Sequence, residues 1–316
     1  MKTILVTGAN GFVGKYLISQ LLKDKDISVV GVVRDGKDIF CYHERLKFFC
    51  IDDINGSTDW SDILFSVDTV VHLAARVHHK NENSNTLYDL YESVNVAGTK
   101  KIAEAALEAG VKKFIFSSSI KVNGEVSIKP FTEKDIPAPQ GPYAISKWQA
   151  EQMLNLLETK DKMMVVSLRL PLIYGPGVKA NFKKIVEWIR KKIPLPFLFV
   201  NNKRSFLFVG NFSNAIMKLI EVETIPDSLY LLSDDQSISA KVLIEKIAKV
   251  LDVKCYLFPL PRGILKFIAK IFGLKNTMNS LIESLEVNNS YFKKQLSWEP
   301  RYSFEEGINL TLLREN

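Results

Sequence analysis

Short apolar runs alternate with longer amphipathic stretches through the first half of the chain. The runs lack the strict apolar–polar alternation of a half-exposed strand, which is typical of parallel strands buried on both faces. We expect strands at Ile4–Thr7, Ser28–Val33, Leu46–Ile51, Thr69–Leu73, Lys113–Ser117 and Val165–Leu170, with helices near 12–23, 85–109 and 143–158. This order predicts an α/β fold, a doubly wound parallel sheet with helices on both faces.

The pattern changes after about residue 170, where several prolines interrupt the chain. Helices are expected near 181–192, 211–222, 240–251 and 263–272, mixed with short strands near 205–208 and 229–232. We therefore expect a first domain of residues 1–170 and a smaller mixed α/β domain of residues 171–316, from which some segments return to the first. The second domain should cover the carboxyl edge of the sheet, where ligands bind in open α/β folds.

Composition narrows the class of protein further. The 316 residues are 47% hydrophobic and 24% charged, which excludes a disordered, collagen-like or coiled-coil chain. No stretch reaches the ~18 apolar residues of a membrane-spanning helix, and no signal peptide is recognisable ahead of the first strand. Cys41, Cys50 and Cys255 lack a paired spacing, so a reducing, cytoplasmic location is expected. His78 and His79 are adjacent and lack further ligands, so we expect no metal site.

Gly8, Gly11 and Gly14 stand at GxxGxxG spacing between the first expected strand and the first expected helix. Glycine permits a tight turn and lets a pyrophosphate approach the backbone at a helix N-terminus. A turn that merely needs glycine conformations is the alternative. In a strand–turn–helix context, the spacing favours dinucleotide binding and a Rossmann-type sheet.

Residues at the end of the second expected strand should contact the adenosine ribose of the cofactor. Dinucleotide sites of this type place an acidic residue there, about 20 positions after the glycines, on the ribose 2′-hydroxyl. Here Arg34 comes first and Asp35 follows. An arginine can pair with a 2′-phosphate, so we expect NADP slightly more than NAD. A surface Arg–Asp pair without a role in binding is the alternative.

Tyr143 and Lys147 stand four residues apart in an expected helix, and therefore on one face. A phenol with an ordinary pKa of about 10 is a poor base at neutral pH, whereas a neighbouring ammonium favours the phenolate. Hydride transfer at a carbinol needs such a proton acceptor, and the reverse reaction needs a donor. Ser119 closes a serine run after the strand Lys113–Ser117, where its hydroxyl can hydrogen-bond the reacting oxygen. Each piece is common by itself, but the three in this order predict an oxidoreductase site.

With these motifs the whole chain resembles the extended short-chain dehydrogenase/reductases, and especially their NAD-dependent epimerase/dehydratase branch, which acts on nucleotide sugars. The resemblance implies that Ser119, Tyr143 and Lys147 are the catalytic residues. It implies cofactor binding by Gly8, Gly11, Phe12, Val13, Gly14, Asp53, Ile54, Leu73, Ala74, Ala75, Asn95 and Pro171, beside Arg34. It implies substrate binding by Asn181 and Arg204 at a nucleotide diphosphate and by Lys121 near the sugar, although a solvated Lys121 fits equally well.

Departures from the family pattern restrict the reaction. The RxGD-type segment near the C-terminus is missing, since residues 279–288 read NSLIESLEVN, and Lys275 is a weak substitute for its arginine. The acidic pair that sugar 4,6-dehydratases carry before YxxxK is not evident, which argues against dehydration. The segment SIKVNG after the fifth strand resembles a sub-branch from surface-polysaccharide pathways, which includes 4-keto sugar reductases and UDP-glucose 4-epimerases.

The excess of positive charge, +7 for the chain, is localised in residues 179–204, and residues 262–275 are also basic. Residues 179–204 carry eight basic residues and one acidic residue, a field that attracts an anion such as a diphosphate. Residues 262–275 carry basic Arg262, Lys266 and Lys270 at four-residue spacing on an apolar background, which is the pattern of an interfacial membrane helix. We prefer a helix packed within the second domain, and peripheral membrane contact or a lipid-linked sugar substrate is the sharper hypothesis. No nucleic-acid-binding signature accompanies the charge.

These features predict NAD(P)-dependent hydride transfer at C4 of a UDP-activated hexose or N-acetylhexosamine. Arg34 slightly favours a 4-keto sugar reductase of surface-polysaccharide synthesis, and a UDP-glucose or UDP-N-acetylglucosamine 4-epimerase that keeps NAD bound is the alternative. A non-catalytic dinucleotide-binding sensor or a nucleic-acid binder is the alternative from another class. Such a protein has no need of Ser119, Tyr143 and Lys147 together. The resemblance also implies a homodimer, formed through the helix near 85–109 and the helix that carries Tyr143.

Overall fold

A seven-stranded parallel sheet forms the centre of the molecule. The computed structural model describes residues 1–34, 41–77, 84–157, 162–261, 263–265, 267 and 281–313. The strands lie in the order β3-β2-β1-β4-β5-β6-β9, and every neighbouring pair is parallel. They are β1 Lys2–Thr7, β2 Ile27–Val33, β3 Leu46–Cys50, β4 Thr69–His72, β5 Lys113–Ser117, β6 Met164–Arg169 and β9 Leu229–Leu231. The predicted Rossmann-type sheet is confirmed.

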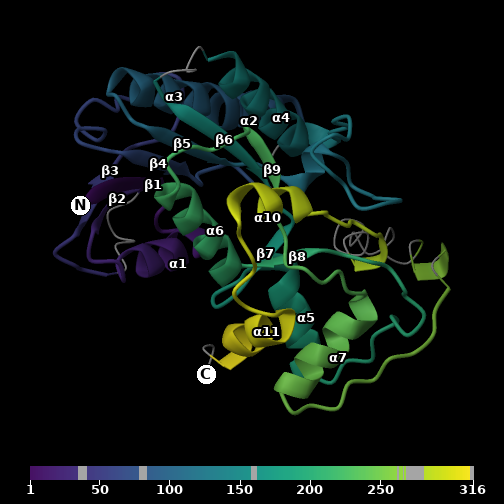
Figure 1. Cartoon of the computed structure of the whole chain (residues 1–316). Coiled ribbons are helices and arrows are strands. Elements are labelled where there is room, and N and C mark those ends of the chain that lie inside the picture. The colour runs from purple at the N-terminus through teal and green to yellow at the C-terminus, as the bar shows by residue number, and fades with distance from the viewer. Residues whose placement is uncertain are drawn as a thin grey trace.

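Helices cover both faces of the sheet (Figure 1). One face carries α2 Ser84–Tyr91, α3 Gly98–Glu108 and α4 Gly141–Leu156, and the other carries α1 Phe12–Leu21, α6 Val209–Glu221 and α10 Ser290–Leu296. Alternate residues of one strand enter opposite cores: Ile4 and Val6 pack in the α1–α6 layer, and Leu5 packs in the α3–α4 layer. Burial on both faces explains why the strands read as unbroken apolar runs.

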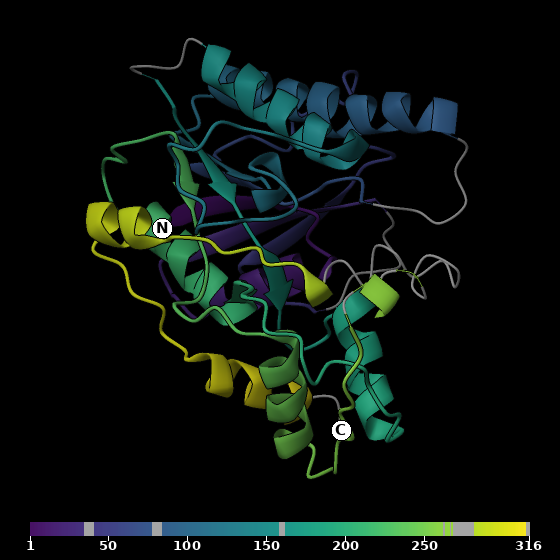
Figure 2. The ribbon, with the colours of Figure 1, turned by 90° about the vertical axis from the view of Figure 1, so that its right-hand side faces the viewer.

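A smaller lobe lies below the sheet in Figures 1 and 2. It contains a parallel pair of short strands, β7 Leu172–Tyr174 and β8 Phe206–Phe208, with the helices α5 Ala180–Arg190, α7 Ala240–Val250 and α11 Phe304–Leu313. The buried ring of Tyr174 lies against Phe182, Phe206, Phe208 and Phe304, with centroids 5.3 to 6.2 Å apart. This aromatic cluster holds the two strands, α5 and α11 together.

Three elements from the second half of the chain belong to the sheet layers. The strand expected near 229–232 is β9, which pairs with β6, although the sequence suggested it for the smaller domain. Helix α6 packs on α1, and Phe292 of α10 packs in the same core as Ile4. β9, α6 and α10 thus pack with elements of the first half, as was expected of some segments of the second half. The domain boundary near residue 170 stays a prediction.

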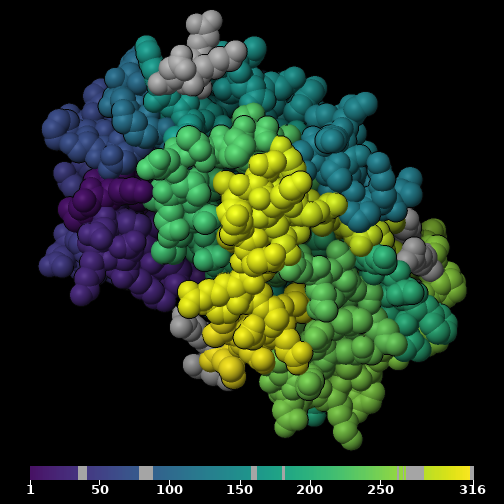
Figure 3. All heavy atoms as spheres, in the orientation of Figure 1, coloured from purple at the N-terminus to yellow at the C-terminus, as the bar shows by residue number. Residues whose placement is uncertain are grey.

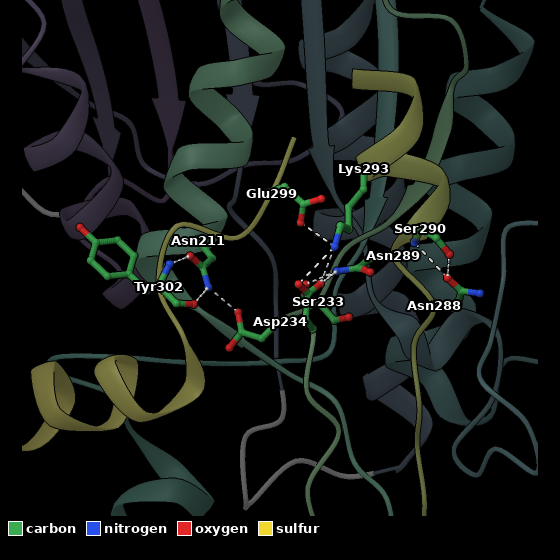
Figure 4. Close-up of polar contacts among 10 residues, drawn as sticks. Asn211, Ser233, Asp234, Asn288, Asn289, Ser290, Lys293, Glu299 and Tyr302 are labelled. Carbon is green, nitrogen blue, oxygen red and sulfur yellow. Dashed lines mark hydrogen bonds and ion pairs between the residues drawn. The ribbon is translucent and has the colours of Figure 1, made fainter. Parts of the chain in front are cut away.

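The C-terminal segment crosses the surface from the sheet half to the smaller lobe, as the yellow atoms in Figure 3 show. Two side chains clasp it (Figure 4). Asn211 at the start of α6 exchanges two hydrogen bonds of 2.8 Å with the backbone of Tyr302 and donates a third, of 2.7 Å, to Asp234. Asn289 donates to the carbonyl of Ser233 at 2.8 Å. These hydrogen bonds attach the C-terminal segment to the start of α6 and to the residues that follow β9.

The helix expected near 85–109 is interrupted by a π-helical turn, Glu92–Ala97, between α2 and α3. The short helices α10 and α11 were not predicted. The helix near 263–272 falls largely outside the described residues, as do Arg262, Lys266, Lys270 and Lys275, so the interfacial-helix hypothesis is not tested. Within the described ranges, no helix is long and apolar enough to cross a membrane.

Candidate active site

The glycine turn after β1 is built for close backbone approach. Gly8 has φ +64°, and a Cβ there would lie 3.1 Å from the backbone nitrogen of Ala74. A Cβ on Gly14 would lie 2.3 Å from the carbonyl oxygen of Gly8, so α1 can pack against the turn only with glycine at this position. Gly11 is the N-cap of α1, and no side chain caps this helix. The first backbone N–H groups of α1, at Phe12 and Val13, are therefore available to an anion such as a pyrophosphate.

A buried histidine that the sequence analysis missed holds the floor of this turn. The hydroxyl of Thr7 accepts the N–H groups of Leu73 and Ala74, each at 3.1 Å, so its own hydrogen goes to Nδ1 of His72 at 2.8 Å. Nε2 of His72 then donates to Thr99 at 3.1 Å. Burial, with a smaller contribution from Lys147, lowers the pKa of His72 to about 3, so the imidazole is neutral. His72 therefore joins β1 and β4 to α3 and leaves Ala74 and Ala75 at the sheet edge.

The chain of hydrogen bonds continues through Asn95 in the π-helical turn. Thr99 donates to the carbonyl of Asn95 at 2.7 Å. The Asn95 side chain accepts the N–H of Arg76 at 2.8 Å and donates to Ser146 on α4 at 3.0 Å. Ser146 in turn donates to the carbonyl of Tyr143 at 2.9 Å. Asn95 thus has its amide committed to this framework, where it fixes the loop after β4 against the helix that carries Tyr143.

The other expected cofactor residues lie beyond the carboxyl ends of the strands. Arg34 is exposed directly after β2, whereas Asp35 is outside the described residues. Asp53 is exposed after β3, and the buried side chain of Ile54 approaches the start of α3 at Gly98. Pro171 is buried two residues after the end of β6. The sheet therefore gathers residues of five separate segments at one edge, as its parallel order requires.

Ser119 and Tyr143 meet at this edge. Ser119 follows β5 and is the N-cap of a 3₁₀ turn, Ile120–Val122, in which its hydroxyl accepts the N–H of Lys121 at 3.3 Å. Tyr143 lies in the first turn of α4, which begins at Gly141 with a proline in its first positions. The side chain of Ser119 lies close enough to the Tyr143 phenol to lower its pKa. The structure thus brings together two of the three residues expected to act on substrate.

Burial sets the protonation of Tyr143. It raises the pKa of the phenol to about 12, although the hydrogen bond from Ser119 works in the opposite direction. Tyr91 packs edge-on against the ring, with centroids 6.3 Å apart, and contributes to the rise. The expected lowering by Lys147 together with a bound nicotinamide ring stays a prediction, because in the chain alone burial is the largest cause of the shift and raises this pKa. At neutral pH, Tyr143 is a proton donor, and it becomes a base only when a further positive charge is brought to the site.

Lys147 lies one turn further along α4, wholly buried. Its ammonium donates to the carbonyl of Ser117 at 2.7 Å and lies 4.5 Å from the centre of the Phe116 ring. Burial lowers its pKa to about 7, and the carboxylate of Glu151 opposes this shift. The last two residues of β5, Phe116 and Ser117, therefore position Lys147 where the serine run begins.

Glu151 and Arg169 form a buried ion pair behind these residues, which the sequence analysis did not single out. Nη2 of Arg169 lies 2.7 Å from one Glu151 oxygen, and Nε donates to both oxygens at 3.1 Å. Ser118 donates to the same carboxylate. The remaining Arg169 contact, at 3.0 Å, is to the side-chain oxygen of Asn123. Four-residue spacing from Tyr143 through Lys147 to Glu151 is the signal that could have revealed it.

The expected substrate residues carry a mixed charge. Lys121 pairs with Glu125 at 2.8 Å, four residues on. Burial lowers the pKa of Arg204 to about 10, with Glu125 and Glu283 opposing the shift. Nη1 of Arg204 donates to the backbone carbonyl of Glu283 at 3.3 Å, so the segment that lacks the family arginine lies directly beside Arg204. Asn181 stands at the start of α5, and its side chain is outside the described residues.

Comparison with known proteins gives a family. The NAD dependent epimerase/dehydratase family matches residues 4–229. The UDP-glucose 4-epimerase of Vibrio cholerae is 37% identical over 313 residues, which are 98% of this chain and 94% of that protein. The dTDP-4-dehydro-6-deoxyglucose reductase of Escherichia coli is 24% identical over 320 residues, which are 97% of this chain and 95% of that protein.

Solved structures share the fold. MoeE5 in complex with UDP-glucuronic acid and NAD aligns with a TM-score of 0.80 over 99% of this chain and 98% of that chain, at 22% identity. The family match spans most of the chain and includes the glycine turn, Ser119, Tyr143 and Lys147. The chain therefore belongs to the NAD dependent epimerase/dehydratase family, and it is an enzyme of the extended short-chain dehydrogenase/reductase type.

Proposed function

We propose that the protein transfers hydride at C4 of a UDP-activated hexose or N-acetylhexosamine. One observation carries this proposal: Ser119 lies close enough to Tyr143 at the carboxyl edge of the sheet to lower its pKa, with Lys147 one helical turn behind. An alcohol and a phenol that share a hydrogen bond can hold a substrate oxygen and pass its proton. A bound nicotinamide supplies the hydride acceptor or donor. The similarity to the Vibrio cholerae epimerase supports a UDP-hexose as substrate.

Each residue has a separate task in this proposal. Tyr143 exchanges the proton of the C4 oxygen, and Ser119 orients that oxygen. The Lys147 ammonium binds the nicotinamide ribose and stabilises the phenolate once substrate and cofactor displace water. The backbone at Phe12 and Val13 binds the pyrophosphate of the cofactor, and Arg204 with the basic segment 179–204 attracts the diphosphate of the substrate.

Two reactions on this site are candidates. A 4-epimerase oxidises C4, lets the keto sugar turn over and returns the hydride to its other face, so NAD never has to leave. Sequence identity over nearly the whole chain with the Vibrio cholerae protein supports this reaction. A 4-keto reductase consumes a diffusible reduced cofactor, and the exposed Arg34 at the end of β2 favours this second candidate with NADPH.

The purified protein distinguishes these reactions through its nucleotide. Absorbance and mass of the released nucleotide should identify NAD at one molecule per chain for the epimerase, together with interconversion of UDP-glucose or UDP-N-acetylglucosamine and their C4 epimers. A site that arrives empty and oxidises NADPH with a UDP-4-keto sugar indicates the reductase, and Arg34→Ala should then raise the KM for NADPH more than that for NADH. Tyr143→Phe is the control for either reaction. Full turnover by this variant would refute the proposal.

The proposal also covers the cellular location of the enzyme, the pathway in which it acts and its oligomeric state. The described cysteines are all free thiols, which fits a cytoplasmic enzyme of surface-polysaccharide synthesis. A homodimer through α2, α3 and α4 is supported by the exposed side chains of Tyr88 on α2 and Leu156 on α4. Light scattering coupled to size-exclusion chromatography should give twice the chain mass of 35.8 kDa. A single-chain mass would rule the dimer out.

A further inference from the structure

We propose that Glu151 is a positioning residue: held by Arg169, it anchors Ser118 beside Ser119 and keeps a negative charge one helical turn from Lys147. The inference rests on the proposed hydride chemistry and adds a residue to its machinery. Glu151 touches neither the expected substrate nor the cofactor. It acts through Ser118, which donates a hydrogen bond to it, and through Lys147, which lies one helical turn away.

The contacts of Glu151 reach each segment that contributes a reacting group. It lies on α4, four residues after Lys147 and eight after Tyr143, and so on their face of the helix. Through Ser118 it holds the end of β5, since the Ser118 backbone also donates to the carbonyl of Leu168 at 2.8 Å. Through Arg169 it holds β6. A shift of this carboxylate therefore moves the serine run and α4 together.

Arg169 extends the network to the 3₁₀ turn that Ser119 begins. Its Nη1 donates to Asn123, the residue that ends this turn, at 3.0 Å. Asn123 also donates to the carbonyl of Thr132 at 3.3 Å. The turn is thus fixed at both ends, by Ser119 at its start and by Asn123 at its close. The orientation of the Ser119 hydroxyl depends on this turn.

The stability of the fold does not account for this ion pair. Glu151 and Arg169 are each 3% exposed. Taking two charges out of water costs about as much as their attraction returns, and apolar residues of similar volume often replace such a pair without loss of stability. The pair therefore contributes little net stability to the fold. The pair has a different effect on Lys147, which lies one helical turn from Glu151. The Glu151 carboxylate favours the charged form of Lys147, which burial disfavours.

The charged and titratable groups around Lys147 come from several elements. They are Tyr143 and Glu151 on α4, His72 on β4, Tyr91 on α2, and Arg169 on β6 with Glu133 beyond it. His72 and Tyr143 are neutral near pH 7, and Arg169 is paired with Glu151. Glu151 is thus the anion that acts on Lys147 among these groups.

The experiment measures the pH profile of kcat/KM for wild type and Glu151→Gln. The wild-type rate should fall on the alkaline side as Lys147 loses its proton. The variant lacks the favourable carboxylate, so this limb should move to lower pH by about one unit, which is a tenfold loss of rate above it. Glu133→Gln is the matched control: it neutralises a half-buried carboxyl near Arg169 without touching Lys147, and its limb should not move.

Two further variants keep the test decisive. Glu151→Leu with Arg169→Met removes both charges, should fold as the wild type does, and should show a limb moved in the same direction but by less, because loss of the Arg169 cation favours the ammonium. Ser118→Ala keeps the charge, so its limb should stay while kcat falls severalfold through a less ordered Ser119. An unmoved limb in the charge-free double variant, or an equal shift in Glu133→Gln, would overturn the proposal.

A direct titration separates this proposal from the proposed reaction. Carbon-13 NMR of labelled lysine side chains follows the Lys147 ammonium without turnover, and Lys147→Arg assigns its signal. A lower pKa in Glu151→Gln than in wild type supports the network even where no tested sugar is converted. Identical titration curves refute it even where turnover is normal.

Discussion

Two lysines are buried against opposite ends of the same strand, and they differ in what their ammonium groups contact. Lys113 is the first residue of β5, and its Nζ donates to the carbonyls of Leu219, Ile220 and Val222 at the end of α6, the first two at 2.8 and 2.9 Å. Lys147 donates to the carbonyl of Ser117, the last residue of β5. Burial lowers the pKa of both, to about 8 for Lys113 and about 7 for Lys147.

The two lysines differ in how many N–H donors of the ammonium group are left without a hydrogen bond to the described residues. An ammonium has three N–H donors, and Lys113 spends all three on the C-terminus of a helix, where a positive charge is also favoured by the dipole. Lys147, among the described residues, makes one such hydrogen bond and lies over the face of an aromatic ring. The first arrangement is complete in itself. The second leaves hydrogen-bonding capacity for a ligand, and this remaining capacity, rather than burial or a shifted pKa, is what distinguishes Lys147 as the lysine proposed to act in the site.

Removing Lys147 should give the largest effect on activity. Lys147→Met is expected to lower kcat/KM by about 10²- to 10³-fold, because proton transfer at Tyr143 and the hold on the cofactor ribose are both lost. Thermal unfolding should change little, since burying the charge was itself costly. The comparison would fail if the variant unfolded readily and the folded fraction turned over normally.

Removing Lys113 should have the opposite outcome. Lys113→Met leaves buried carbonyls at the end of α6 without donors, which is expected to cost about 1–3 kcal/mol in the free energy of unfolding. Urea denaturation measures this loss. Activity per folded molecule should equal that of wild type, because the site lies at the other edge of the sheet. A large loss of kcat with normal stability would contradict the assignment.

The smallest effect is expected from Lys2, which donates to the carbonyl of Ile220 at 3.0 Å and whose charge lowers the pKa of Lys113. Between pH 8 and about 10 the unfolded chain holds the Lys113 proton more often than the native chain, so the free energy of unfolding should rise with pH. Lys2→Met raises the native pKa and should make this rise shallower. A steeper rise in the variant would show that Lys2 does not repel Lys113.

The sequence predicted the parts of the molecule that local patterns determine. The strand–helix order, the glycine turn and the spacing of Tyr143 and Lys147 each follow from neighbours along the chain, and the sheet with its carboxyl edge follows from them. Residues whose role depends on contacts across the sheet were missed. His72 reads as one apolar-strand residue among others, and only the register of β1 against β4 places it under Thr7.

The sequence could not show how strongly burial acts on the titratable groups. Spacing along a helix places Lys147 near Tyr143, but it gives no measure of the desolvation that raises the pKa of Tyr143 in the chain alone. Arg169 was likewise visible only as part of a strand end. Its partner lies 18 residues earlier on another element, and only the packing of α4 on β6 reveals the pair.

The sheet layers include elements from the second half of the chain, and this affects how the protein folds during its synthesis. A ribosome that has released residue 170 has made six strands of the sheet, but not β9, α6 or Trp298, whose ring closes the core around Phe292. At about 5–20 residues per second, the remaining chain takes on the order of ten seconds to emerge. During that time the nascent edge strand β6 is open to pairing with other chains. The first half of the chain therefore completes its core only after Trp298 has been made, and a fragment cut near residue 170 would expose the edge that β9 covers.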